Sequence, residues 1–156
     1  MQPLTVKSNA FEEGGLIPIR YTARGEDLSP DFELEGIVDH AESIAITCDD
    51  ASHPLFPNYN HWVIWNIPVQ EIIKEGIPRG ATVDSLGGAI QGIAYGRNRY
   101  KGPKPPLNAF HTYVFTVYVL DCKIDLSPKS RKRDLLNQME GHILQQATLL
   151  GKFKNR

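Results

Sequence analysis

The chain has 156 residues, of which 41% are hydrophobic and 22% are charged, and this composition is typical of a soluble globular protein. The length suits one domain over residues 1–156, and no apolar run is long enough to span a membrane. The N-terminus lacks a basic start followed by an apolar stretch, so we expect no secretory signal and a cytoplasmic location.

The charge is unevenly distributed: residues 1–100 carry a net charge of −7 and residues 101–156 a net charge of +6. The basic excess peaks in "KSRKR" (129–133), which we interpret as the solvated first turn of a helix. No aromatic residues interleave with it and no nucleic-acid fold signature accompanies it, so we expect no nucleic-acid partner. It also lacks an adjacent apolar insertion face, so we do not expect membrane contact.

The only two cysteines, Cys48 and Cys122, are too few for a disulfide framework and lack metal-ligand spacing. Both lie in apolar, strand-like contexts, which favour buried free thiols. We therefore expect neither a resident metal nor a cofactor.

Three segments predict strands because β-branched and aromatic residues dominate them: "SIAITCDD" (43–50), "HWVIWNIP" (61–68) and "HTYVFTVYVLD" (111–121). Alternation along each strand assigns its side chains to faces. One face of the first strand holds Ile44, Ile46, Cys48 and Asp50. One face of the second holds His61, Val63 and Trp65. One face of the third holds His111, Tyr113, Phe115, Val117 and Val119. The opposite face of the third segment is also largely apolar, so this strand is expected to be central and covered on both sides.

Helix is predicted only near the C-terminus, where Ser127 and Pro128 form an N-cap and first-turn pair. Helical spacing then links Leu135, Leu136, Met139, Ile143 and Leu144. Gly141 interrupts this pattern, so one helix and two short helices both remain open, and residues 147–153 predict a final short strand. Many strands with long loops and little helix indicate a mostly β protein, a β-sandwich with short peripheral C-terminal helices.

Polar side chains lie at the ends of the three predicted strands. Asp50 closes the first, His61 opens the second, and His111 with Tyr113 opens the third. If these ends meet at one rim, the carboxylate fixes a histidine tautomer, and the two rings and the hydroxyl can donate to an anion. Backbone N–H groups near Gly102 would add donors. Each residue alone also has an ordinary structural interpretation, as a satisfied strand-end or core residue.

Several motifs follow one another in order: "FEEGGLIPIRYTARGEDLSPDFELEGI", "CDDASHP", "HWVIWNIP", "GPKPP" before "HTY", and "LLNQMEGHILQQATLLGKF". From about residue 11 to residue 153 the chain resembles the phosphatidylethanolamine-binding protein family, also called the Raf kinase inhibitor protein family, in its bacterial and archaeal branch. The resemblance implies a β-sandwich around a large central sheet, with a small pocket at one edge for phosphate or phosphoryl head groups. The implied pocket residues are Asp50, His61, Gly102, Pro103, Pro105, His111 and Tyr113, with Pro106 in the same loop.

Among the positions that depart from the family pattern, which include His53 in place of an alanine, three are expected to tune the pocket: Ser52, Lys104 and Thr112. Ser52 stands where the family has an aspartate, and Thr112 stands where it has an arginine. An aspartate and an arginine that are lost together leave neither charge unpaired. Since Lys104 adds a positive charge, we still expect the pocket to prefer anions.

The predicted function is therefore the binding of a small phosphorylated ligand or inorganic anion, without catalysis. Modulation of a partner kinase or protease stays open, as does a homodimer. An alternative is a protease or kinase inhibitor acting through an exposed loop at residues 52–60. Two weaker alternatives are a hydrolase that uses Ser52, which has no G-x-S-x-G motif, and a metal site of Asp50, His61 and His111.

Overall fold

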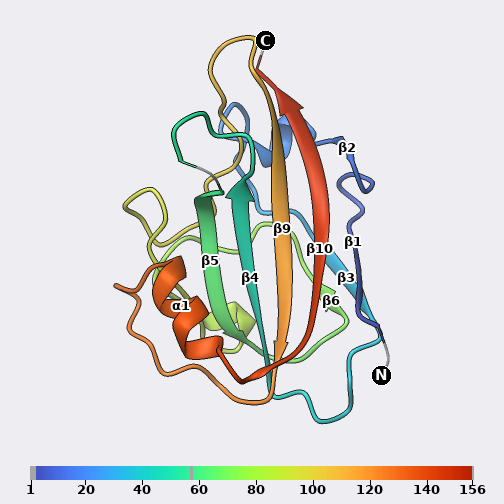
Figure 1. The fold of residues 1–156 in the computed structure, drawn as a ribbon, viewed down its shortest axis with the longest axis vertical. Helices are drawn as coiled ribbons and strands as arrows, with labels where there is room; N and C mark the ends of the chain where they lie inside the picture. The colour runs from blue at the N-terminus through green and yellow to red at the C-terminus, as the bar shows by residue number, and fades with distance from the viewer. Residues whose placement is uncertain (1–2, 57, 156) are drawn as a thin grey trace.

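The computed structural model describes residues 3–56 and 58–155, which form a β-sandwich of two unequal sheets (Figure 1). The large sheet has seven strands in the order β2 (Gly15–Leu16), β10 (Ile143–Lys154), β9 (Phe110–Leu120), β4 (Ser43–Asp50), β5 (Tyr59–Ile67), β8 (Ala89–Gln91) and β7 (Thr82–Val83). The small sheet has three, in the order β1 (Thr5–Lys7), β3 (Phe32–Glu35) and β6 (Ile72–Ile73). The pairing of β2 with β10 is parallel and the other pairings are antiparallel.

The three predicted strands are confirmed as β4, β5 and β9, with ends that differ by at most two residues. β9 lies between β10 and β4 in the large sheet, so it is central, as its two apolar faces predict. The first core cluster fills the space between the two sheets, with Phe32 from the small sheet and Phe115 from β9 among its members. The second cluster packs the other face of the large sheet against Leu135 and Met139 of α1 (Lys132–Met139).

The C-terminal segment differs from its prediction in three ways. Ser127 forms a turn instead of an N-cap, because its hydroxyl accepts the Lys129 N–H and its carbonyl accepts the Ser130 N–H. The helix begins at Lys132 and ends before Gly141, whose φ of 83° favours glycine. Ile143 then opens β10, so the predicted strand at 147–153 was too short. One α-helix is therefore present in the described chain, together with two short 3-10 turns (Ile19–Tyr21 and Asp84–Leu86).

The long pairing between β9 and β10 explains this difference. β10 pairs with β9 from the Ile143–Leu120 pair to the Lys154–Phe110 pair, and a bulge follows Ile143. A ladder of this length provides backbone hydrogen bonds that outweigh the weak helical preference of a few residues.

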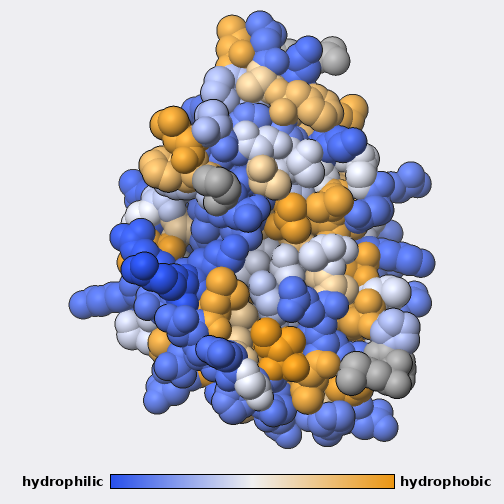
Figure 2. Space-filling model, viewed as in Figure 1, coloured by the Kyte–Doolittle hydropathy of each residue, from blue (hydrophilic) through white to orange (hydrophobic). Residues whose placement is uncertain are grey.

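The surface agrees with this layered arrangement. On the face in Figure 2, hydrophilic residues gather on the side where Figure 1 draws α1, while hydrophobic residues are interspersed over the remainder. Across residues 3–56 and 58–155, no helix combines the length and the apolar character needed to cross a bilayer.

Candidate functional site

The predicted site residues converge at one end of the large sheet. β4 is antiparallel to both β5 and β9, so its last residue lies beside the first residues of its two neighbours. Asp50 pairs directly with Tyr113, and its Oδ2 accepts a hydrogen bond of 2.7 Å from Nδ1 of His111. Both side chains of this bond are more than nine-tenths buried. Asp50 therefore holds the His111 ring at this end of the sheet.

His61 reaches the same place through a β-bulge. Cys48 pairs with Trp62 but Asp49 pairs with Asn60, so His61 is an extra residue in β5. The predicted shared face with Val63 and Trp65 is wrong, since these two residues pack in the second core cluster. The His61 ring instead packs edge-on against Tyr113, with ring centroids 5.4 Å apart.

The tautomer of His61 follows from its hydrogen bonds. Nδ1 lies 2.7 Å from the carbonyl oxygen of Lys101, and because a carbonyl only accepts, the proton lies on Nδ1. Burial lowers the pKa of His61, although the bond to Lys101 and the nearby Asp50 work in the opposite direction. His61 therefore favours the neutral ring, with Nε2 as an acceptor.

Tyr113 has the most unusual polar environment of the site. The residue is fully buried, and its hydroxyl has no hydrogen-bond partner of normal geometry in the described chain. Burial, and next the carboxylate of Asp50, raise the pKa of Tyr113 well above its ordinary value, and the backbone of Lys104 partly offsets this. The hydroxyl therefore keeps its proton, and a buried donor without a partner costs about 1–3 kcal/mol.

Tyr95, which sequence reasoning missed, completes the rim. Its ring lies 4.8 Å from His61 and 5.0 Å from Tyr59, centroid to centroid, and its hydroxyl lies 3.5 Å from Nε2 of His61. Burial raises the pKa of Tyr95 to about 12. Tyr95 and Gly96, with φ of 52° and 71°, form a two-residue turn closed by reciprocal hydrogen bonds between Ala94 and Arg97. The "YG" pair was a signal for the turn but not for its place beside His61.

The loop at residues 101–106 is anchored by groups far away in the sequence. The Gly102 N–H donates to Oδ1 of Asp27 at 2.7 Å, so the expected Gly102 donor is not available to a ligand. A Cβ on Gly102 would lie only 2.4 Å from the carbonyl oxygen of Tyr21, so glycine is required here by close packing. Asp27 was also missed by sequence reasoning, since nothing in "RGEDL" marks it.

The prolines of this loop are held through their carbonyl oxygens. Pro103 accepts the Ala23 N–H at 3.1 Å, and Pro105 accepts a side-chain N–H of Asn155 at 2.6 Å. Both prolines are buried, whereas the Lys104 side chain between them is exposed. The predicted stiffness of the loop thus has two sources, the proline rings and these hydrogen bonds.

Two of the departures from the family pattern, Ser52 and Thr112, are neighbours. The Ser52 hydroxyl accepts the Thr112 N–H at 3.0 Å, and the Ser52 N–H donates to Oδ1 of Asp50 at 2.9 Å. The two positions are close enough for a compensating pair, as the resemblance implies. In the described part of the chain, Ser52 has no hydrogen bond to His61 or His111, so the geometry of a nucleophile and base is not assembled.

A metal-ligand grouping lies at the opposite end of β9. Among the described residues, only Asp121, Cys122 and His142 bring three ligand atoms within 4.8 Å of one another. Nδ1 of His142 already bonds to the Asp121 carboxylate at 2.8 Å.

Cys48 is a buried free thiol as predicted, whereas Cys122 is only partly buried.

The loop at residues 52–60 contributes rings to the rim and also leaves apolar surface exposed. His53 stacks on Tyr59 with centroids 4.9 Å apart, and Phe56 lies 5.8 Å from Tyr59. Leu55 and Phe56 are 77% and 56% exposed, while Pro57 lies outside the described residues. Tyr59 therefore packs beside His61 at the rim. The apolar side chains of Leu55 and Phe56 face solvent.

Comparison with known proteins places this architecture among relatives. Residues 7–154 match the family model described as phosphatidylethanolamine-binding protein. A UPF0098 protein of Pyrococcus abyssi is 40% identical over 151 residues, covering 96% of this chain and 84% of that protein. The crystal structure of a phosphatidylethanolamine-binding protein homologue from Chlamydia trachomatis superposes with a TM-score of 0.87 at 28% identity, covering all of both chains.

A second solved structure shows the fold alone. YbcL of Escherichia coli, described as a new member of the mammalian family, superposes with a TM-score of 0.89 at 22% identity, covering 98% of this chain and 99% of that one. Residues 7–154, which match the family model, include the three predicted strands, the anchored proline loop and the Asp50–His111 pair. The chain belongs to the phosphatidylethanolamine-binding protein family.

Proposed function

We propose that the chain binds small oxyanions, such as phosphate or a phosphoryl head group, at the rim formed by Asp50, His61, His111 and Tyr113. The single observation that carries this proposal is the buried Tyr113 hydroxyl, which has no hydrogen-bond partner in the described chain. Buried polar groups are normally paired, so an orphan donor at a strand end is best explained by a ligand that accepts from it.

His111 supplies the second donor. Because Asp50 holds Nδ1, the other ring nitrogen is left for the ligand, and the protonated ring donates from both nitrogens. When the His111 ring carries a second proton, its charge and that of the Asp50 carboxylate cancel, so the pair does not repel an anion. The Lys104 backbone lies near the Tyr113 hydroxyl. The exposed Lys104 side chain adds positive charge to the same loop.

The number of donors sets the expected affinity. A charge-assisted hydrogen bond contributes about 1.5–3 kcal/mol, and two such bonds must also offset the entropy lost by the bound ligand. With the Gly102 N–H occupied by Asp27, few further donors are at hand. We therefore expect weak binding, with dissociation constants of about a millimolar.

Isothermal titration with phosphate and with O-phosphorylethanolamine tests this function. We expect both to bind the unmodified chain, and His111→Gln to weaken binding about tenfold or more. His40→Gln, which changes an exposed histidine elsewhere, is the matched control and should bind normally. Absence of binding at millimolar ligand, or equal binding by His111→Gln, would overturn the assignment. Binding of phosphorylethanolamine but not phosphate would identify the head group as the ligand.

A second candidate, contact with a partner kinase or protease, is supported by the exposed Leu55 and Phe56. Exposed large apolar side chains on a loop suit a protein interface. Inhibition assays on a panel of serine proteases and kinases would compare the unmodified chain with Leu55→Ser/Phe56→Ser. Inhibition lost in the double variant supports this candidate, and no inhibition by either protein removes it.

A further inference from the structure

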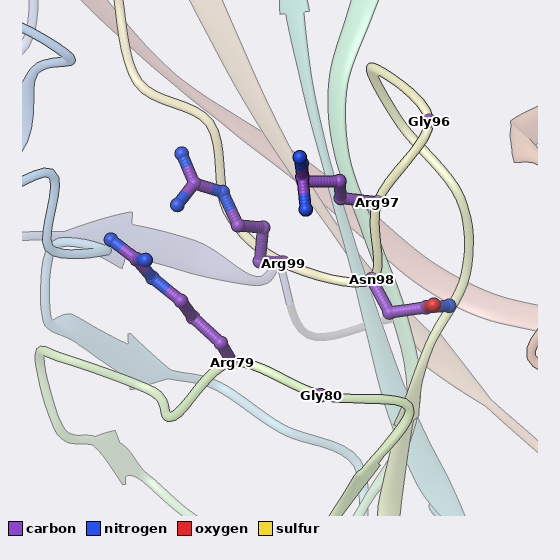
Figure 3. Close-up of a pocket in the computed structure, with 6 residues that line it drawn as sticks. All are labelled: Arg79, Gly80, Gly96, Arg97, Asn98 and Arg99. Carbon is purple, nitrogen blue, oxygen red and sulfur yellow. The ribbon is translucent and has the colours of Figure 1, made fainter.

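We propose that Arg79, Arg97 and Arg99 form a second oxyanion site, separate from the histidine rim, for a small molecule that carries two or more phosphate groups. These arginines line a surface hollow of about 670 Å³, together with Gly80, Gly96 and Asn98. The hollow lies between the loop after β6 and the turn between β8 and β9. Figure 3 shows the three arginine side chains extending from these two loops, with Arg99 between the other two.

The backbone that carries the arginines is well fixed. The Gly80 N–H donates to the carbonyl oxygen of Asn98 at 2.9 Å, which joins the two loops. The Asn98 side chain donates to the carbonyl oxygens of Gln91 and Pro128 at 2.8 and 2.7 Å. Arg97 closes the tight turn through its bonds with Ala94. The fold therefore fixes the shape of the hollow and the backbone positions from which its arginine side chains extend.

The charge of the hollow is unbalanced. Arg99 pairs with Asp27 at 3.0 Å, whereas neither Arg79 nor Arg97 has an ion pair within the described residues. No acidic side chain is among the residues that line the hollow. Neighbouring like charges repel one another, and a bound anion removes this repulsion.

Arg99 has a donor that the fold itself leaves unsatisfied. Its side chain is 16% exposed, and its Nε–H is buried without a hydrogen-bond partner in the described chain. The guanidinium thus retains donor capacity after it pairs with Asp27. Guanidinium groups bind phosphate and carboxylate oxygens through two parallel hydrogen bonds, and this geometry suits an oxyanion better than a halide.

The size and lining of the hollow define the class of ligand. Its volume lies in the range of small-molecule sites, roughly 300–1,000 Å³. Two unpaired arginines call for at least two negative charges, and the residues that line it offer no aromatic ring on which a base could stack. A compact, multiply phosphorylated molecule fits these features better than a nucleic acid.

The positive surface continues from this hollow toward the histidine rim. A smaller recess of about 100 Å³ shares Arg97 and Arg99 with the hollow and adds Tyr95 and Lys101. The Lys101 ammonium lies 5.8 Å from the centre of the Tyr95 ring. A ligand with a second phosphate could therefore extend toward Tyr95, but the proposed site requires only the arginines.

Isothermal titration with pyrophosphate at low salt tests the proposal. We expect Arg79→Gln/Arg97→Gln to weaken pyrophosphate binding about tenfold or more. Lys129→Gln/Arg133→Gln removes the same charge from exposed positions elsewhere and should change binding less than twofold. All four side chains are at the surface or nearly so, and circular dichroism should confirm that both variants fold. The same comparison is repeated in a His111→Gln background, where the histidine rim is impaired: pyrophosphate binding that persists there and falls when Arg79→Gln/Arg97→Gln is added belongs to the arginine hollow.

Four outcomes would overturn the proposal. No pyrophosphate binding by the unmodified chain removes the site, as does unchanged binding in Arg79→Gln/Arg97→Gln. Equal losses in the two double variants would show a diffuse electrostatic attraction. Tighter binding of a single-stranded oligonucleotide than of pyrophosphate, with competition between them, would assign the hollow to nucleic acid.

Discussion

The histidine rim and the arginine hollow differ in how they accommodate charge. At the rim, the charged Asp50 is buried and paired with His111, and the unused polar group is a neutral hydroxyl. In the hollow, the charges are more exposed and two of them have no acidic partner in the described chain. A buried site can discriminate between ligands through a few fixed donors. An open basic hollow attracts anions through its net charge, and salt screens this attraction.

Asp27 connects the two regions. Its Oδ1 accepts the Gly102 N–H of the proline loop, and its Oδ2 pairs with Arg99 of the hollow. The carboxylate is 7% exposed, so both of its bonds are shielded from water. One buried carboxylate therefore holds the loop of the rim and an arginine of the hollow in a common arrangement.

Removing the charge of Asp27 should give the largest effect. Asp27→Asn keeps an acceptor for Gly102 but leaves Arg99 without its counter-charge. We expect a loss of about 2–3 kcal/mol in the free energy of unfolding, less than for a fully buried ion pair because Arg99 is partly exposed. Urea denaturation followed by tryptophan fluorescence measures this.

Asp39→Asn is the control for this prediction, since Asp39 is exposed and should change stability by no more than about 0.5 kcal/mol. Equal stability of Asp27→Asn and the unmodified chain would show that the two regions are not coupled through this carboxylate.

Tyr113→Phe should separate binding from stability at the rim. The substitution removes a buried hydroxyl that has no partner in the described chain, so the unfolding free energy should rise by about 1 kcal/mol. Phosphate binding should weaken about tenfold, because the ligand loses a donor. Thermal unfolding with and without phosphate measures both. A destabilised variant would show that the hydroxyl has a partner in the folded protein and would remove the observation that carries the proposed function.

His61 should give a smaller, pH-dependent effect. Its folded-state pKa lies below its ordinary value of 6.5, so the unfolded chain binds more protons in this range. The stability from a neutral His61 is complete above pH 6.5 and is lost as the pH falls toward the folded-state pKa. Between pH 7.5 and about 5.5 the melting temperature should therefore fall more for the unmodified chain than for His61→Gln. Parallel curves for the two proteins would contradict this.

Much of the fold and the candidate site could be predicted from the chain itself. Alternation placed His111 and Tyr113 on one face of β9 and Asp50 at the end of β4, since a strand repeats every two residues. The register of β4 and β9 then pairs Asp50 with Tyr113. Alternation failed at His61, because β5 has an extra residue at this point, which breaks the regular alternation of side chains between the two faces of the strand. Helical spacing failed at Ile143, where pairing with β9 overrode a helical pattern that depended on only a few residues.

The amino-acid sequence by itself determined the β-rich architecture, the strands β4, β5 and β9 and the polar residues at their ends, because these follow from local periodicity and composition. The tertiary structure decided which donors are available. Only packing across distant segments could show that Asp27 takes the Gly102 N–H, or that Tyr113 has a buried hydroxyl without a partner in the described chain. Only the folded loops bring Arg79 beside Arg97 and Arg99. Hydrogen bonds and charge pairs between remote residues depend on three-dimensional distance, which local periodicity does not encode.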